Sequence, residues 1–109
     1  MSSDSQKAGV KPAAGVRHEL LTLARMSLII GDEEKEQLEK KAASNPEISI
    51  QKILVEGGHV REATIHSLEL AQTLIEQGAI NESQFCIGIY DEVTTGIPMR
   101  ESLTARGWL

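Results

Sequence analysis

The chain has 109 residues, a length that fits one domain. Hydrophobic residues make up 40% of it but aromatic residues only 3%, so Leu, Ile, Val and Ala must form the core. The net charge is −5 and the 11 Lys and Arg residues are scattered, which argues against a basic surface for nucleic acids or anionic membranes.

The first 15 residues hold almost no large apolar side chain, so we predict a flexible tail there and a helical repeat domain over 16–109. Apolar residues at helical intervals predict a first helix over 16–30, which Gly31 stops. A second helix is predicted over 32–43, because its acidic first turn suits the helix dipole.

Turn residues at 44–46 separate that helix from a short one over 50–56, for which Ser49 can act as the N-cap. The alternation at 48–51 also fits a short strand, but we favour the helix.

Three more helices complete an all-α fold, a small bundle of short helices. A stripe that includes Ile65 and Leu68 predicts a helix over 61–77, stopped by Gly78. Asn81 and Gln84 form a capping box that opens a helix through Val93, ending at 94–96. Pro98 suits the first turn of a last helix over 99–106, which Gly107 closes.

One phrase recurs along the chain: a short Leu-rich helix, a glycine, an aliphatic residue and a polar helix start. The aliphatic markers are Ile30, Val60, Ile80 and Leu109, at intervals of 30, 20 and 29 residues. These intervals predict a two-part unit of about fifty residues, whose copies stack and leave their connecting turns as a candidate binding surface.

The glycines of these turns are expected to end their helices with positive φ. We therefore predict left-handed backbone at Gly58, Gly78 and Gly107, and packing of the preceding helices through Leu54, Leu74 and Leu103. Replacing Gly78 with valine should lower the free energy of unfolding by about 1–2 kcal/mol, measured by urea denaturation, because β-branched residues avoid positive φ. An unchanged unfolding midpoint would contradict the repeat.

Two segments resemble the N-terminal regulatory domain of type II secretion and type IV pilus assembly ATPases. They read Leu54-Val55-x-x-Gly58-x-Val60-x-Glu62-x-x-Ile65-x-x-Leu68-x-x-x-Gln72 and Gly96-Ile97-Pro98-Met99-x-x-x-Leu103-x-x-x-Gly107. The resemblance covers residues 20–109. It implies a helical domain without catalytic residues, which in some members binds cyclic di-GMP through paired motifs and in others docks on cytoplasmic proteins of the membrane complex.

The nucleotide-binding members begin their motif with Arg-Leu-Gly, whereas the matching positions here read Ser49-Ile50-Gln51 and Pro98-Met99-Arg100. The phosphate loop of the ATPase core is also absent from the sequence. We therefore expect a protein-interaction or regulatory domain whose partner belongs to a secretion or pilus complex. The alternative is a cyclic di-GMP sensor, and the resemblance then implies these ligand-binding positions: Ser49, Ile50, Leu54, Gly58, Arg61, Met99 and Arg100.

A helix-turn-helix DNA binder is a third possibility, with 67–77 and 81–93 as its helices. The second of these helices, which would enter the DNA groove, carries acidic residues and no Lys or Arg, so phosphate repulsion argues against DNA binding.

Other chemistry-bearing residues receive structural interpretations. Cys86 is expected in the core, and a lone cysteine suits a reducing cytoplasm. No apolar run reaches the length of a membrane span. The histidines complete no metal site, and the carboxylates are expected in helix first turns or on polar faces. The histidines are His18, His59 and His66, and the carboxylates are those of Glu33, Glu34, Glu36, Glu62, Asp91 and Glu92.

The C-terminal Trp108 either packs back on the repeat or anchors a partner, with packing favoured. Trp108 and Leu109 are therefore the candidate partner-binding residues. The sequence stops where a new unit would begin, which indicates a fragment or an end covered by another subunit.

Overall fold

A computed structural model describes residues 17–109, and the predicted tail over 1–15 lies outside them. The described residues form α-helices and no strand, so the helix predicted over 50–56 is confirmed against the alternative of a short strand at 48–51. The helices are α1 (Leu20–Met26), α2 (Asp32–Ser44), α3 (Ile50–Glu56), α4 (Glu62–Glu76), α5 (Glu82–Thr95) and α6 (Met99–Ala105).

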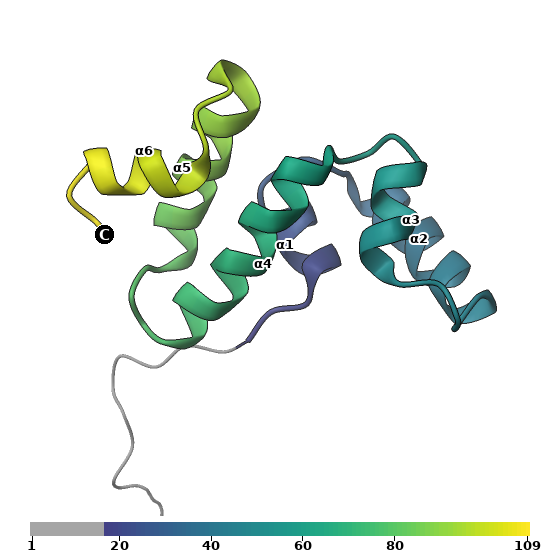
Figure 1. Ribbon diagram of the computed structural model, residues 1–109. Helices are drawn as coiled ribbons and strands as arrows, with labels where there is room; N and C mark the ends of the chain where they lie inside the picture. The colour runs from purple at the N-terminus through teal and green to yellow at the C-terminus, as the bar shows by residue number, and fades with distance from the viewer. Residues whose placement is uncertain (1–16) are drawn as a thin grey trace, which may run out of the picture.

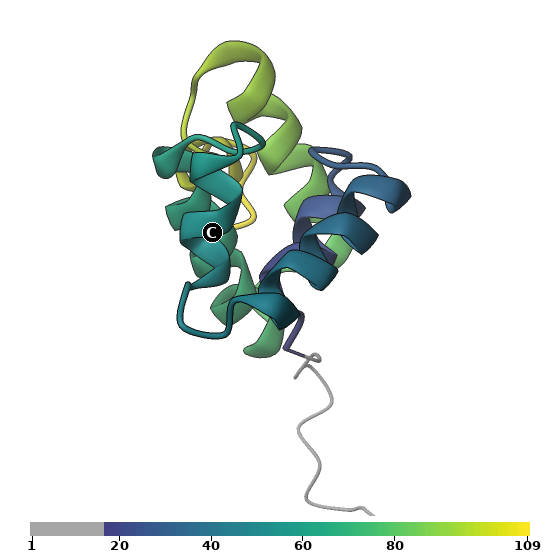
Figure 2. The ribbon, with the colours of Figure 1, turned by 90° about the vertical axis from the view of Figure 1, so that its right-hand side faces the viewer.

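The helices are arranged around α4, as Figure 1 shows. The short α1 packs against α4, with α2 and α3 on one side of this pair and α5 and α6 on the other. Turning the molecule by 90° places α3 at the near end and α6 at the far end (Figure 2). The two short helices that carry the motif copies therefore lie at opposite ends of the array.

One aliphatic cluster runs through the molecule and forms its core. Leu23, Leu54, Leu68 and Leu103 are fully buried, and Phe85 is the one aromatic ring among the largest buried side chains. Leu74, predicted to pack like Leu54 and Leu103, is only half-buried, because the neighbouring Ile75 takes the inward position. Leu74 nevertheless packs against the core cluster, so the packing prediction is confirmed for all three leucines, with Leu74 the least buried of them.

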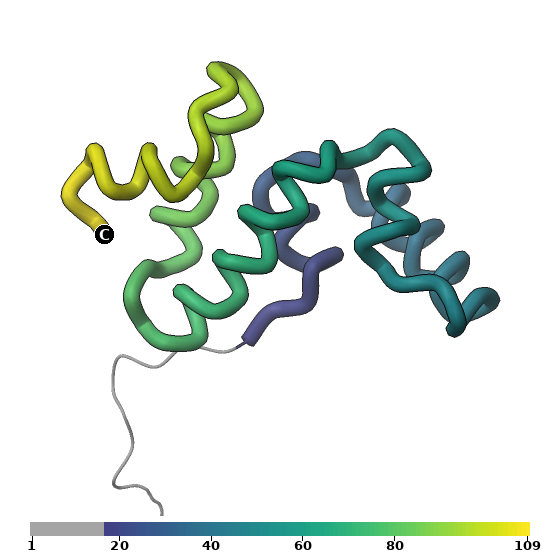
Figure 3. The backbone as a smooth tube through the Cα atoms, viewed as in Figure 1, coloured from purple at the N-terminus to yellow at the C-terminus, as the bar shows by residue number. Residues whose placement is uncertain are grey.

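Three helix ends have the geometry predicted from the glycines. Gly58, Gly78 and Gly107 lie at φ values of 76°, 76° and 80°. After each glycine, the next amide donates to a carbonyl five residues before it, as from His59 N to Leu54 O at 3.1 Å. This is the hydrogen bond that closes a helix at a left-handed residue. The backbone tube in Figure 3 follows the reversals from α3 to α4 and from α4 to α5.

The fourth turn has the same hydrogen bonds but a leucine in place of glycine. Leu28 lies at φ 65°, and Ile29 N donates to Ala24 O at 3.0 Å. The expectation that Gly31 stops the first helix is therefore wrong. Leu28 ends the helical stretch three residues earlier, and α1 covers seven residues instead of the predicted 16–30.

The short helices share a fixed internal spacing. Their N-caps are Glu19, Ser49 and Pro98, and each left-handed residue follows its N-cap by nine positions. Pro98 is therefore the N-cap and not part of the first turn. The repeat consists of this short module, which recurs before α2, before α4 and at the end of the chain.

Replacing Leu28 with glycine should raise the free energy of unfolding by roughly 0.5–1 kcal/mol. The left-handed backbone of a leucine costs roughly 1–2 kcal/mol, and the greater freedom of an unfolded glycine returns part of the gain. The Leu28 side chain is 78% exposed, so little packing is lost. Urea denaturation measures the change. Leu28→Ala keeps the strained backbone and should change stability little; an equal gain in both variants would contradict the explanation.

Candidate functional site

The residues of the first motif copy mostly support the fold. The Ser49 hydroxyl accepts a hydrogen bond from Lys52 N at 3.2 Å and so caps α3, as predicted. Leu54 is fully buried and Ile50 is half-buried. Gly58 provides the left-handed turn. Only Arg61, the exposed N-cap residue of α4, presents a charged group to a ligand.

The second motif copy does not join the first. Met99 is fully buried, and its backbone N–H donates to Glu92 Oε1 at 2.8 Å. Arg100 is exposed on α6, at the other end of the array from α3 (Figures 1 and 2). Arg61 and Arg100 therefore do not converge on one ligand site.

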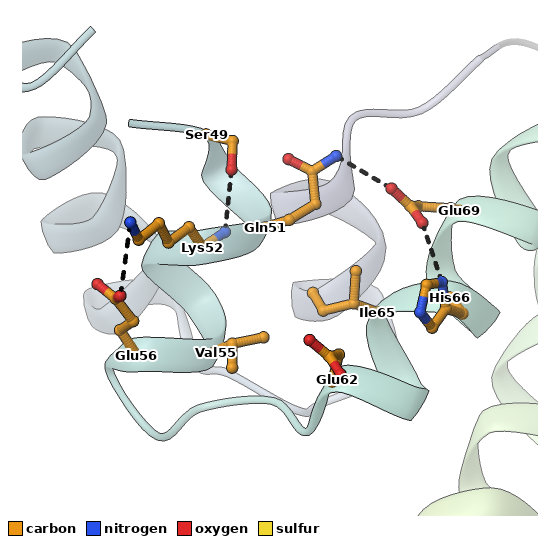
Figure 4. A pocket seen from close by; sticks show the side chains of 9 residues that line it. All are labelled: Ser49, Gln51, Lys52, Val55, Glu56, Glu62, Ile65, His66 and Glu69. Atoms are coloured by element: carbon orange, nitrogen blue, oxygen red, sulfur yellow. Dashed lines mark hydrogen bonds and ion pairs between the residues drawn. The ribbon is translucent and has the colours of Figure 1, made fainter. Parts of the chain in front are cut away.

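A hollow between α3 and α4, which we call the acidic groove, contains the predicted Ser49. Figure 4 shows Glu69 between two partners, with Gln51 Nε2 donating to it at 3.1 Å and His66 Nδ1 lying at 3.6 Å. Two further carboxylates line this hollow, against one lysine. Its charge opposes binding of a phosphate ligand. The lining residues are Ser49, Gln51, Lys52, Val55, Glu56, Glu62, Ile65, His66 and Glu69.

A second hollow lies where two of the repeat turns approach the end of α5. We call it the turn groove, and its volume is about 410 Å³. No carboxylate of the described residues lines it, whereas Arg61 and His59 do. Its lining residues are Leu28, Ile29, His59, Val60, Arg61, Thr64, Val93 and Gly96.

Exposed apolar side chains continue from the turn groove along α5. Leu28 is 78% exposed, Tyr90 67% and Val93 57%. Cys86 Sγ donates to Met26 O at 3.6 Å, so this face of α5 lies against the end of α1. Positions 86, 90 and 93 share one helix face, which places Tyr90 between that contact and the groove. Leu28, Tyr90 and Val93 therefore form one apolar surface, which sequence analysis missed because its residues come from two distant segments.

The reactive side chains have structural partners. His18, His59 and His66 lie on separate elements and face Glu82, Glu34 and Glu69. The described residues bring together no group of three metal-ligating side chains. Burial, and secondarily the Glu82 carboxylate, raises the pKa of the Cys86 thiol, so the thiol stays protonated at neutral pH.

The C-terminal aromatic residue packs against the array. Trp108 is half-buried against the core, and the Arg106 guanidinium lies 5.5 Å from the centre of its ring. Arg106 in turn donates to Asp91 Oδ2 at 3.0 Å, and the Ser102 hydroxyl donates to the same oxygen. Leu109 is 43% exposed beside this cluster.

Acid should weaken the attachment of α6 through Asp91. The hydrogen bond from Ser102, followed by that from Arg106, lowers the pKa of Asp91. The folded state then holds the proton less tightly than the unfolded chain, whose aspartate pKa is about 3.9. This stabilisation is present above about pH 4 and is lost as the pH falls through the lowered value. Urea denaturation of wild type and Asp91→Asn between pH 2 and 6 should show a shallower pH dependence in the variant; parallel curves would contradict this role.

Within the described part of the chain, no helix combines the length and apolar character needed to cross a bilayer. Comparison with models of protein families, with curated proteins and with solved structures gives no match.

Proposed function

We propose that this chain is a non-catalytic protein-interaction domain, of the kind that its sequence resembles in secretion and pilus ATPases. The apolar surface of Leu28, Tyr90 and Val93 beside the turn groove carries the proposal. Exposed apolar side chains that gather on one surface mark protein-interaction sites, and tyrosine is enriched among the residues that dominate interface binding energy. Two of these three residues line the groove itself, so the surface offers both a pocket and a rim.

In this proposal the domain works in the cytoplasm as a docking or regulatory part of a larger assembly. Its single cysteine, Cys86, is unpaired and suits a reducing compartment. The resemblance points to a secretion or pilus component as the partner.

Quantitative co-purification from the native cell extract tests the proposal. The wild-type chain should retain a protein at stoichiometric ratio, identified by mass spectrometry, and Tyr90→Ser/Val93→Ser should lose it. Both replaced side chains are exposed, so the fold should survive, which circular dichroism checks. Trp108→Ala reports on the other candidate surface. A wild-type chain that elutes alone and binds a nucleotide tightly would overturn the proposal.

A cyclic di-GMP sensor is the second candidate, and the setting of Arg61 favours it. No carboxylate lines the hollow that this guanidinium lines, so a phosphate there would meet less like charge than in the acidic groove. Because only one arginine reaches this hollow, it should bind the nucleotide more weakly than a site with two arginines. Isothermal titration with cyclic di-GMP separates the candidates: heat at micromolar protein that disappears in Arg61→Ala supports the sensor, and no heat favours protein docking.

A further inference from the structure

The turn at position 28 does not need a leucine side chain to form. Three equivalent turns are made with glycine at the same position, and they form the same hydrogen bonds. Leucine there is strained, and 78% of it faces solvent. Backbone strain that persists at an exposed residue is typical of functional sites. The turn therefore exposes an aliphatic side chain at the turn groove, which Val93 also lines.

The charges around the groove indicate what kind of group lies opposite. Four other hollows on residues 17–109 are each lined by at least one carboxylate, for example Glu62, Glu39, Asp91 and Glu82. The turn groove has none, on a chain of net charge −5. Complementary charge is how interfaces select their partners, so this groove suits an acidic partner better than the rest of the surface does.

The two basic side chains of the groove differ in availability. His59 Nδ1 lies 3.3 Å from Glu34 Oε2 and already has an acidic neighbour. Arg61 forms no ion pair with another described residue, and its side chain does not cap α4. A guanidinium binds carboxylates with two parallel hydrogen bonds. Arg61 is thus the group that would meet a partner carboxylate.

We infer that the turn groove binds a short acidic and aliphatic segment of a partner protein, with Leu28, Tyr90 and Val93 contacting its aliphatic residues and Arg61 pairing with its carboxylate. The inference rests on the proposed function and adds the chemistry of the partner. A basic segment would leave Arg61 facing like charge.

Peptide titration followed by amide chemical shifts tests the inference. The probes are a peptide with leucine and glutamate at helical spacing and its twin with lysine for each glutamate. The acidic peptide should shift amides around Leu28, Arg61 and Val93, and the basic peptide should not. Arg61→Glu should reverse this preference. Leu28→Ala should weaken binding by on the order of ten-fold, as for an interface anchor, while Glu36→Gln on the exposed face of α2 should leave it unchanged.

Several outcomes would overturn the inference. These are equal shifts from both peptides, shifts confined to the region of Trp108 and Leu109, no shifts at millimolar peptide, or concentration-dependent shifts without peptide that indicate a second copy. If the co-purified partner is retained by Leu28→Ala and Arg61→Glu but lost with Trp108→Ala, the inference fails while the proposed function stands. If the wild-type chain retains no partner at all, the proposed function itself fails.

Discussion

Replacing Glu92 with alanine is expected to lower the free energy of unfolding by about 2–4 kcal/mol. Glu92 lies in α5 with only 4% of its surface exposed. Its Oε1 accepts hydrogen bonds from the Ser67 hydroxyl at 2.6 Å and from Met99 N at 2.8 Å. Each buried donor left without an acceptor costs about 1–3 kcal/mol. This carboxylate therefore ties α4 and the start of α6 to α5, and urea denaturation measures its contribution.

Two further variants separate hydrogen bonding from charge. Glu92 Oε2 has no partner among the described residues. Glu92→Gln therefore keeps an accepting oxygen at the position of Oε1 and puts its amide nitrogen at the position of Oε2. It should be markedly less destabilising than alanine. Ser67→Ala removes one donor and so leaves no buried donor without an acceptor. It should lower the free energy of unfolding by only about 1 kcal/mol. Equal losses for the glutamine and alanine variants would show that the hydrogen bonds are not what stabilises this junction.

Replacing Gly88 with valine should lower the free energy of unfolding by about 2–3 kcal/mol and loosen α6. A Cβ atom at Gly88 would lie 2.8 Å from Met99 Cγ and 3.1 Å from Leu103 Cδ2. Both side chains are fully buried, so neither moves away without disturbing the core. Overpacking of this kind typically costs about 1–3 kcal/mol. For a β-branched residue we expect a loss near the upper end of this range. Urea denaturation gives the loss, and amide exchange in α6 shows whether that helix detaches.

A double variant provides the control for this close contact. Met99→Ala alone leaves a cavity, but combined with Gly88→Val it frees the space that the valine needs. The double variant should therefore lose less stability than the two single changes together. Additive losses would place the damage of Gly88→Val outside the contact between α5 and α6.

The predictable part of the fold follows from local rules. Ser49 and the pair Asn81 and Gln84 cap their helices as expected, because capping depends on residues within one turn. The aliphatic marker of each turn also identified the reversals correctly, including the one at Ile30. The prediction named the wrong residue as the end of the first helix. Conformational propensity favours Gly31, whereas Leu28 takes the left-handed position.

The candidate site depended on contacts that local rules do not reach. Glu92 was expected on a polar face, yet the structure buries it against α4 and α6. One signal was available: Pro98, as an N-cap, has no side-chain acceptor for the first amides of α6, so these amides need water or an acceptor from another residue. The turn groove combines residues near 28, 61 and 93, and only the folded chain brings them together.

The constant spacing of the short modules bears on how such a chain can lengthen. The interval after the first module contains one long helix, α2, and the interval after the second contains two, α4 and α5. The extra helix is joined through the Gly78 turn, which repeats the end of a module without its short helix. Whole helices can thus be inserted between modules while each module keeps its geometry, as in proteins that grow by adding stacked units. The distance between the short helices α3 and α6, at the two ends of the array, is then set by the helices inserted between them.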